Sequence, residues 1–292
     1  MGETRSRSFY FLAAFFIAYV LFLYGPMFAI YVLSFQGPDG GLTFPMNGVS
    51  LTWFGKVFSG GGIVDIGAAF RRSLQLGLVV MLLTVVLSVS AGMAFRKSFR
   101  GASVLFYSAI ASLIMPSIIT SLGIALEFRL FDDFMIKHGS DGWTTAMGLF
   151  TSGLGAHLTW TLPFGLLIMF AIFNRFDARL EEAARDLGAT PWQTFRHVVL
   201  PIILPSVVGI GLFGFTLSWD ELARSSQAIG SVNTLPLELQ GLTTTVTKPD
   251  IYALGTITSA VSFLVIFTAL IVILVLQARQ RRHGSDAGQG ML

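Results

Sequence analysis

The sequence predicts an all-α, polytopic membrane protein with six transmembrane helices, and three observations lead to this fold class. Of the 292 residues, 53% are hydrophobic and 12% are charged, whereas soluble domains carry about 25% charged residues. Six apolar runs are each long enough to cross the bilayer core as a helix, which takes about 20 residues. The basic residues gather at the ends of these runs, which is typical of membrane topology and not of nucleic-acid binding.

The six predicted spans cover residues 9–35, 74–95, 102–126, 149–173, 198–219 and 251–278. Helices are expected because a backbone in lipid must satisfy its own hydrogen bonds, and the short alternating segments of a membrane β-barrel are absent. The first run is longer than the core of a signal peptide and lacks a clear cleavage site after it, so we expect it to be retained. Pro26, Pro116 and Pro163 lie inside runs and predict kinks or local openings.

The charges between the spans predict the orientation, because Lys and Arg accumulate in cytoplasmic loops. With the N-terminus inside, 12 of the 19 basic residues are cytoplasmic, namely Arg5, Arg7, Arg96, Lys97, Arg100, Arg175, Arg179, Arg185, Arg196, Arg279, Arg281 and Arg282. The others are Lys56, Arg71, Arg72, Arg129, Lys137, Arg224 and Lys248. Both termini are therefore predicted to be cytoplasmic. Arg71 and Arg72 fit least well, and we interpret them as an interfacial pair that snorkels at the start of the second span.

The segments between the spans are too small to be separate domains. Residues 36–72, 127–148 and 220–250 lie outside in this topology, and none could bury a core of its own. We therefore expect one membrane domain. The chain has no cysteine, which excludes disulfides, thiol nucleophiles and cysteine-ligated zinc.

A polar segment at residues 177–201, here called the elbow, interrupts the apolar sequence and predicts two short helices on the cytoplasmic side. Asp177 can cap the first helix, and Gly188 suits the left-handed position that ends it. The apolar stripe of this helix would be Leu180, Ala183, Ala184 and Leu187.

The second predicted helix of the elbow begins with a strong local signal. Thr190 can act as its N-cap, Pro191 occupies the first helical position, and Gln193 completes a capping box. The helix would run towards Pro201, where the membrane begins. The elbow is thus either a rigid loop without a partner or a stiff surface for docking another protein.

The elbow resembles the EAA loop of ABC-importer permeases, which reads EAA, three residues, Gly, nine residues, an aliphatic, any residue and Leu-Pro. The matching positions are Glu182, Ala183, Ala184, Gly188, Val198, Leu200 and Pro201. The resemblance is strongest over residues 70–277 and implies the fold of a type I ABC-importer permease. It also implies three parts: an N-terminal helix and extracytoplasmic segment (1–69), the permease domain (70–277) and a cytoplasmic polar tail (278–292).

Within that family, residues 215–226 ("FTLSWDELARSS") and 234–257 are similar to the C-type subunits of spermidine/putrescine permeases. Asp220 and Glu221 keep the acidic pair of those subunits. Trp219 stands where they usually have a leucine, and Arg72 stands where they often have an asparagine. The resemblance implies a pore for a polyamine, although related permeases carry other small organic solutes such as amino-acid derivatives and opines.

The resemblance also implies partners. Two permeases, here a heterodimer with a second homologous subunit, form the pore in the bacterial inner membrane, surrounded by lipid. An extracytoplasmic binding protein delivers the solute, and each elbow docks on a cytoplasmic dimer of ABC ATPase subunits. Glu182 would contact the ATPase or brace the elbow. Close approach would be allowed by small or rigid neighbours, namely Ala183, Ala184, Gly188, Ala189 and Pro191.

ATP must be handled by another chain, because the phosphate-binding pattern G-x-x-x-x-G-K-[ST] does not occur in this sequence. We therefore expect this chain to be no enzyme and to bind no cofactor itself, with ATP and Mg²⁺ on the partner ATPase. No metal site is predicted, and no nucleic-acid partner is expected.

Four residues are candidates for the substrate pathway. His157 lies in the fourth span, where an ionisable group is either functional or a neutral ring hydrogen bonded to a neighbouring helix. Trp219 is either an interfacial anchor or a pore residue. Asp220, beside Glu221, could hold an ammonium group together with an aromatic face; alternatively it pairs with Arg224, four residues on.

Two other functional classes fit the sequence less well. A membrane-embedded enzyme would need a catalytic constellation, but the four histidines are scattered and no H-E-x-x-H occurs. A secondary transporter would need ion-coupling acids at mid-membrane, but the six runs are nearly free of acids. Both classes are therefore less favoured than an importer permease.

Overall fold

The computed structural model describes residues 6–59, 65–139, 142–245 and 249–288, and the regular elements within these ranges are helices. They are α1 (Arg7–Leu33), α2 (Thr52–Phe58), α3 (Ile66–Phe95), α4 (Ala102–Ala111), α5 (Ser117–Lys137), the π-helix η1 (Leu149–Gly153), α6 (Leu154–Phe173), α7 (Arg179–Asp186), α8 (Pro191–Thr194), the π-helix η2 (Phe195–Val199), α9 (Leu200–Trp219), α10 (Ser225–Ala228), α11 (Leu235–Thr245) and α12 (Asp250–Gly288). The prediction of an all-α fold is confirmed.

Five helical stretches of the described chain are long and apolar enough to cross a membrane: Arg7–Leu33, Ile66–Phe95, Leu149–Phe173, Pro191–Trp219 and Asp250–Ala278. The shorter apolar helix α4 accompanies them. This pattern confirms a multi-pass membrane protein. It agrees with five of the predicted runs, but the third run differs.

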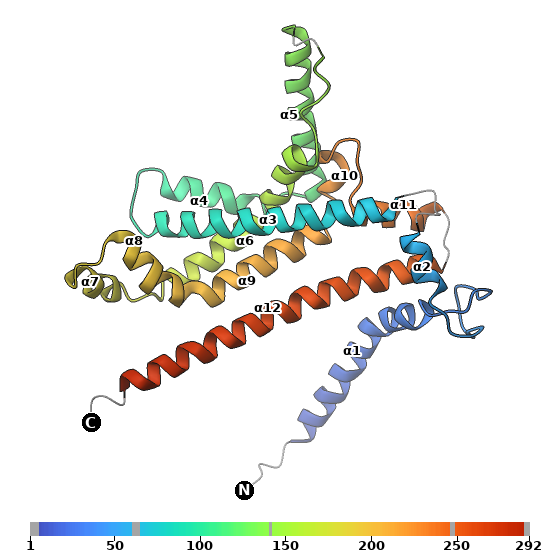
Figure 1. Cartoon of the computed structure of the whole chain (residues 1–292), viewed down its shortest axis with the longest axis horizontal. Coiled ribbons are helices and arrows are strands. Elements are labelled where there is room, and N and C mark those ends of the chain that lie inside the picture. Colours follow the sequence, from blue (N-terminus) through green and yellow to red (C-terminus); the bar gives the residue numbers. More distant parts are fainter. Residues whose placement is uncertain (1–5, 60–64, 140–141, 246–248, 289–292) are drawn as a thin grey trace. The chain divides into compact units, whose positions relative to one another are not determined.

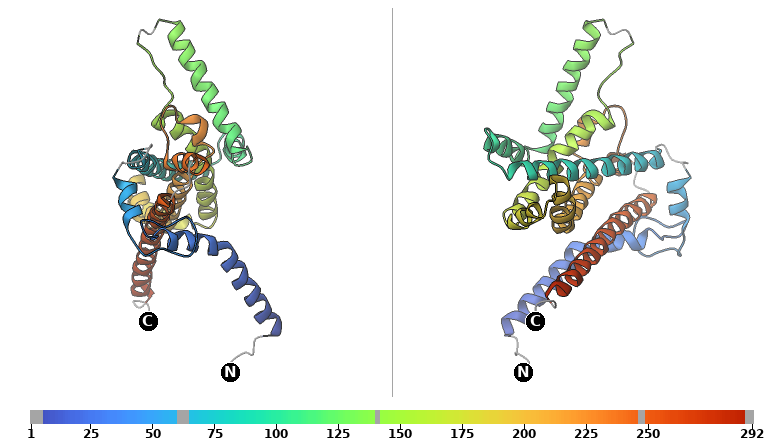
Figure 2. Two further views of the ribbon diagram at one scale, coloured as in Figure 1. Left: turned by 90° about the vertical axis from the view of Figure 1, so that its right-hand side faces the viewer. Right: turned by 60° about the vertical axis from the view of Figure 1, so that its left-hand side comes forward.

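The third predicted run, residues 102–126, is not one continuous helix. Helix α4 ends at Ala111, and α5 begins at Ser117 with Pro116 as its N-cap residue. Proline lacks a backbone N–H and disfavours helical geometry in the residue before it, so the predicted opening at Pro116 separates two helices. Figures 1 and 2 show that α5 leaves in a different direction from α4.

The other two prolines singled out in the sequence lie inside continuous helices. Pro26 is within α1 and Pro163 is within α6. Both helices continue past their proline, although its missing N–H removes one backbone hydrogen bond. Pro116, in contrast, separates two helices.

The chain forms two compact units, residues 1–67 with 239–261 and residues 68–238 with 262–292. In the first unit, the buried Gln36 organises the loop after α1, because its side-chain oxygen accepts from the backbone N–H of Asn47 at 2.7 Å. Trp53 of α2 donates its indole N–H to the backbone oxygen of Gln36 at 2.9 Å. Tyr252 at the start of α12 donates its hydroxyl to the backbone oxygen of Leu42 at 3.1 Å.

The second unit is built around α3, α6 and α9, with α7 and α8 at one end and α10 at the other (Figure 1). Its buried apolar cluster consists of Met169, Val199, Ile203 and Ile210. A buried hydrogen bond of 2.7 Å joins the hydroxyls of Thr84 and Thr161, and thus α3 to α6. Small and hydroxyl-bearing residues permit such close helix packing inside a membrane.

The glycines of α9 illustrate this packing. A Cβ at Gly214 would lie 3.2 Å from the Cα of Met81, and one at Gly211 would lie 3.4 Å from Val85, so both glycines face α3 of the same chain. A Cβ at Gly209 would meet nothing within 4 Å. Gly209 is therefore the glycine of these three that has open space beside it within the chain.

The start of α3 also differs from expectation. The helix begins at Ile66, so Arg71 and Arg72 lie inside it. Arg72 donates from Nε to the backbone oxygen of Asn233 at 2.7 Å, and the next residue, Ser73, accepts from the backbone N–H of Leu235 at 2.8 Å. Arg71 is exposed. Arg72 therefore links α3 to the loop before α11. This role differs from the predicted one, in which Arg71 and Arg72 together snorkel at the start of the span.

Replacing Gly165 by alanine is expected to lower the stability of the second unit by about 1–3 kcal/mol, the usual cost of overpacking. The added Cβ would overlap the hydroxyl oxygen of Ser88 and lie 3.2 Å from Ile210 Cγ2. Thermal unfolding in detergent measures the effect. Gly123→Ala is the matched control, because a Cβ there meets nothing within 4 Å; equal melting temperatures for the two variants would contradict the tight α3–α6 contact.

Candidate functional site

The first helix of the elbow ends as its sequence predicts. Gly188 has φ +85°, its N–H donates to the backbone oxygen of Arg185 at 2.8 Å, and the N–H of Ala189 reaches that of Ala184 at 3.0 Å. These two bonds form a Schellman motif. At the other end, Asp177 lies one residue before the N-cap position and accepts from the backbone N–H of Arg179 at 3.0 Å.

The second part of the elbow is capped as predicted, but it is not a separate helix. Thr190 and Gln193 form the capping box with bonds of 2.8 and 3.3 Å, and Pro191 occupies the first position. The helix then passes through the π-turn η2 into α9, so Pro191–Trp219 is continuous. Pro201 lies just inside α9 and does not interrupt it. The second part of the elbow is therefore continuous with the fifth span.

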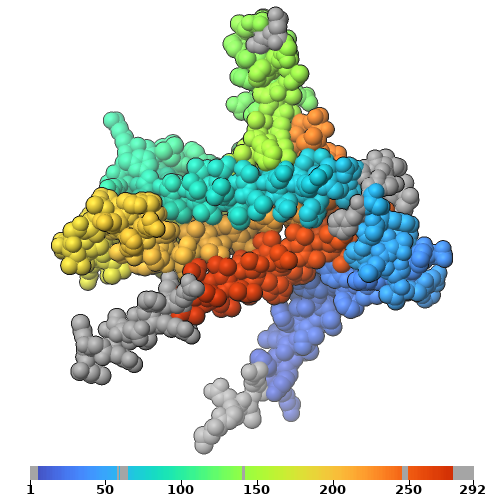
Figure 3. All heavy atoms as spheres, viewed as in Figure 1, coloured from blue at the N-terminus to red at the C-terminus, as the bar shows by residue number. Residues whose placement is uncertain are grey.

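The residues of the EAA motif lie together on one end of the second unit, the yellow region of Figure 3. Glu182, Ala183, Gly188, Pro191 and Pro201 are exposed, while Ala184, Ala189 and Leu200 are partly exposed. The predicted apolar stripe is also open to the surroundings. Its end residue Leu187 is 90% exposed, and Trp192 beside the turn is 64% exposed. This end of the second unit thus carries apolar residues that no other part of the described chain covers.

Glu181, which was not among the residues selected from the sequence, braces the elbow. Glu181 is buried, and its carboxylate accepts from Arg96 Nη1 at 2.6 Å and from Arg185 Nη2 at 3.2 Å. The partner Arg96 directly follows α3, 85 positions earlier in the chain. Of the two neighbouring acids, Glu181 therefore faces inward and Glu182 faces outward. The sequence signal was an arginine that directly follows a long apolar helix, the first of three basic residues at positions 96, 97 and 100.

At the other end of the second unit, His157 is buried and hydrogen bonded on both ring nitrogens. Nδ1 lies 2.8 Å from the hydroxyl of Ser218, and Nε2 lies 2.9 Å from that of Ser225. The Ser225 hydroxyl donates to the backbone oxygen of Glu221, which leaves it to accept from Nε2–H of the ring. His157 therefore joins α6 to the end of α9 and to α10, and a role in contacting solute stays a prediction.

Arg224 is the second residue whose importance the sequence argument missed. Its side chain is fully buried; it donates from Nη1 to Ser117 at 2.8 Å and from Nε to Thr159 at 3.3 Å, and its Cζ lies 4.5 Å from the centroid of the Trp160 ring. Its salt-bridge partner is Glu221, at 3.6 Å. The arginine thus ties the start of α5 to α6 and to the loop after α9.

The alternative that Asp220 pairs with Arg224 is therefore wrong. Helix α9 ends at Trp219, and Asp220 has φ −104° and ψ 11°, so the helical spacing of four residues no longer applies. Asp220 is exposed, whereas Trp219 is 2% exposed and packs against Phe215 and Phe70. Protein atoms partly desolvate the carboxyl group and raise the pKa of Asp220 above its usual value, although much of the residue stays exposed.

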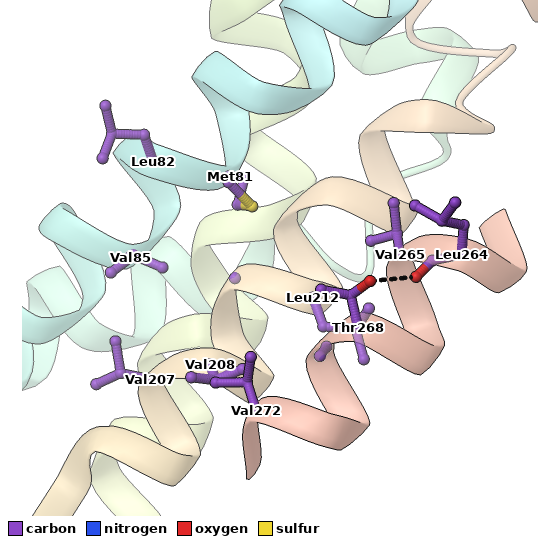
Figure 4. Close-up of a pocket in the computed structure, with 12 residues that line it drawn as sticks. Met81, Leu82, Val85, Val207, Val208, Leu212, Leu264, Val265, Thr268 and Val272 are labelled. Carbon is purple, nitrogen blue, oxygen red and sulfur yellow. Dashed lines mark hydrogen bonds between the residues drawn. The ribbon is translucent and has the colours of Figure 1, made fainter. Parts of the chain in front are cut away.

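An apolar groove of about 440 Å³ lies between α3, α9 and the later part of α12 (Figure 4). Val85, Leu212 and Leu264 are among the residues that line it. The hydroxyl of Thr268 in this groove already donates to the backbone oxygen of Leu264 at 2.7 Å. The groove therefore suits hydrocarbon, and a solute with charged amines would find no partner in it.

Comparison with known proteins gives a consistent result. The family model described as "Binding-protein-dependent transport system inner membrane component" matches residues 84–283. The chain is 31% identical to the spermidine/putrescine transport system permease protein PotC of Haemophilus influenzae, over 95% of this chain and 100% of that relative. It is 30% identical to the putrescine transport system permease protein PotI of Escherichia coli K12, over 81% of each chain.

Solved structures share the fold at lower identity. A bacterial ABC transporter involved in the import of the acidic polysaccharide alginate matches with a TM-score of 0.60, 16% identity and 94% coverage of both chains. The MetNI methionine ABC transporter, in inward-facing conformations, matches with a TM-score of 0.55 and 17% identity, over 70% of this chain and 93% of that chain.

Proposed function

This chain belongs to the family of binding-protein-dependent transport system inner membrane components, and from that premise we propose that it forms part of the pore of an ATP-driven polyamine importer. The elbow is the observation that carries the proposal. Its motif residues lie on α7, in the turn at Gly188 and on the capped helix that continues into the fifth span. The polyamine substrate is supported by the spermidine/putrescine and putrescine permeases to which the chain is similar.

The proposed partners are the other subunits that such an importer needs. A dimer of cytoplasmic ABC ATPase subunits would dock on the elbow, where Leu187 and Trp192 are uncovered. The ATPase would bind ATP and Mg²⁺. A second homologous permease would complete the pore as a heterodimer, and an extracytoplasmic binding protein would deliver the solute. Native mass spectrometry of the intact complex tests this composition, because two copies of this chain without another permease would contradict it.

The proposed orientation places the elbow and both termini in the cytoplasm of a bacterium, with the chain in its inner membrane. The excess of Lys and Arg on that side supports this orientation. Residues 70–277 would then form the permease domain, preceded by the helix and extracytoplasmic segment of residues 1–69. Helix α12 continues to Gly288, so the proposed cytoplasmic tail of residues 278–292 begins as helix.

The proposed entry to the pore lies at the outer end of α9. Glu221 is held by Arg224, whereas the neighbouring Asp220 carries an exposed carboxylate. An ammonium group arriving from outside would therefore meet Asp220 first. Glu221, Trp219 and His157 would shape this end from the buried side, because each of them already has partners within the chain.

Replacing Asp220 by asparagine is expected to lower polyamine uptake by about tenfold, since the loss of about 1.4 kcal/mol of attraction corresponds to that factor. Assembly and basal ATP hydrolysis should survive, because the substitution keeps the shape of the side chain. Radiolabelled uptake into proteoliposomes measures the effect, with Asp133→Asn, another exposed acid, as the control. Unchanged uptake would remove Asp220 from the pathway.

The pH dependence of uptake provides a separate check on Asp220. Desolvation raises the pKa of this carboxyl group, so protonation begins at a higher pH than for an ordinary aspartate, and the charge is lost as pH falls. Wild-type uptake should therefore decline on acidification in a range where Asp220→Asn is insensitive. Parallel pH profiles for the two proteins would contradict this role.

The substrate itself is tested by the ligands that the partner binding protein recognises. The amino-acid derivatives and opines carried by related permeases are the alternative, and the alternative substrates carry carboxylates that polyamines lack. A thermal-shift screen of the partner binding protein against polyamines, amino acids and opines separates the two classes. Stabilisation by opines and not by putrescine or spermidine would contradict the proposed substrate while leaving the importer role intact.

A further inference from the structure

The contact between the elbow and the end of α3 lies where a displacement of the elbow would be transmitted to α3. Helix α7 packs on α8 and η2, and these segments lead without interruption into α9. The elbow is therefore fixed to the fifth span through the backbone. Its connection to α3, in contrast, is made through side chains, by the ion pair of Arg96 and Glu181 at 2.6 Å.

The surroundings of this ion pair are unlike those of an ordinary surface pair. The side chains of Arg96 and Glu181 are 19% and 10% exposed, so water screens their attraction only weakly. The guanidinium carbon lies 4.9 Å from the ring centroid of Phe173 and 5.0 Å from that of Phe176. Cation–π contacts of this kind fix the orientation of the guanidinium.

The other charges near the pair cannot replace it. Arg185 also contacts Glu181, at 3.2 Å, but it lies on α7 itself and its side chain is 59% exposed. A bond between two residues of one helix cannot tie that helix to α3. Lys97, the residue after Arg96, is exposed. Arg96 is therefore the cation that connects the buried carboxylate of the elbow to a different span.

We propose that Arg96 and Glu181 form a strut that makes α3 move with the elbow when the ATPase changes conformation. The inference rests on the proposed function, because it needs an ATPase docked on the elbow. Both residues are positioning residues in this account, and neither contacts ATP or solute. The neighbouring cavity of about 300 Å³ that Arg96 and Phe173 line gives the end of α3 room to shift.

The test compares the amount of solute imported per ATP hydrolysed by the full transporter in proteoliposomes. Arg96→Gln and Glu181→Gln should each lower this ratio by at least about fivefold, the lower end of typical coupling between sites. The double variant should be no worse than either single variant, because both remove the same link. Arg96→Lys, which keeps the charge, should recover part of the ratio. Lys97→Gln is the matched control and should behave as wild type.

The outcomes separate the strut from the importer function. Wild-type ratios in both single variants, with wild-type uptake still dependent on ATP, would overturn the strut alone. Loss of the ATPase subunit from the single variants would also overturn it, because the pair would then serve docking and not transmission. Additive losses in the double variant would show that the two residues act separately. If wild-type uptake needed no ATP, the proposed function itself would fail.

Discussion

Replacing Arg224 by methionine is expected to destabilise the second unit by about 3–5 kcal/mol, the usual cost of removing one partner of a buried ion pair. Arg224 is fully buried, and its partner Glu221 has a side chain that is only 11% exposed. Methionine would fill part of the space but would leave Glu221 without its cation, and Ser117 and Thr159 without their donor. Chemical unfolding in detergent, followed by tryptophan fluorescence, measures the change.

Two further variants isolate the cause of that loss. Arg71→Met removes an exposed arginine and should change stability little, because exposed side chains make few contacts. Adding Glu221→Gln to Arg224→Met should recover part of the stability, since the amide removes the uncompensated charge. Arg224→Met with wild-type stability would contradict the assignment of Arg224 as the link between α5, α6 and the loop after α9.

Replacing Gly188 by valine is expected to lower solute uptake by more than about tenfold. The glycine has φ +85°, and left-handed geometry costs a side chain with a Cβ roughly 1–2 kcal/mol, with β-branched residues the least suited. Open space surrounds the position, so the effect comes from the backbone and not from a clash. The turn would rearrange and move Glu182 and the exposed apolar residues away from their positions.

Asparagine and aspartate at the same position separate conformation from charge. Gly188→Asn should retain most of the uptake, because asparagine tolerates the left-handed region. Gly188→Asp has the same shape but adds a carboxylate at the proposed contact, so we expect weaker retention of the ATPase subunit during purification. Normal retention and normal uptake in the valine and aspartate variants would contradict the role of this turn.

The elbow was predictable in detail because its structure depends on interactions between near neighbours in the sequence. The capping box of Thr190 and Gln193 and the turn at Gly188 need only residues within a few positions of each other. Sequence reasoning failed where the helix geometry ends. The bridge from Asp220 to Arg224 assumed a continuing helix, but α9 stops at Trp219, and the arginine pairs with Glu221 instead.

The contacts that join distant segments could not be predicted from one sequence. Arg96 and Glu181 are 85 positions apart, and no local pattern states which of the acids Glu181 and Glu182 faces inward. The sequence predicted a kink or local opening at Pro116, but it could not show that Arg224, 107 positions after Ser117, holds the start of α5. The continuous path from the elbow into α9 was missed because Pro201 was taken to mark a boundary.

The most direct test of the central proposal is import of labelled putrescine and spermidine by proteoliposomes that contain this chain, a homologous permease and the ATPase. The account predicts uptake that requires both ATP inside the vesicles, where the elbow would face, and the binding protein outside. It also predicts that Gly188→Val lowers uptake by more than about tenfold without loss of the chain from the membrane. Uptake that proceeds without ATP and follows an imposed ion gradient would contradict the account.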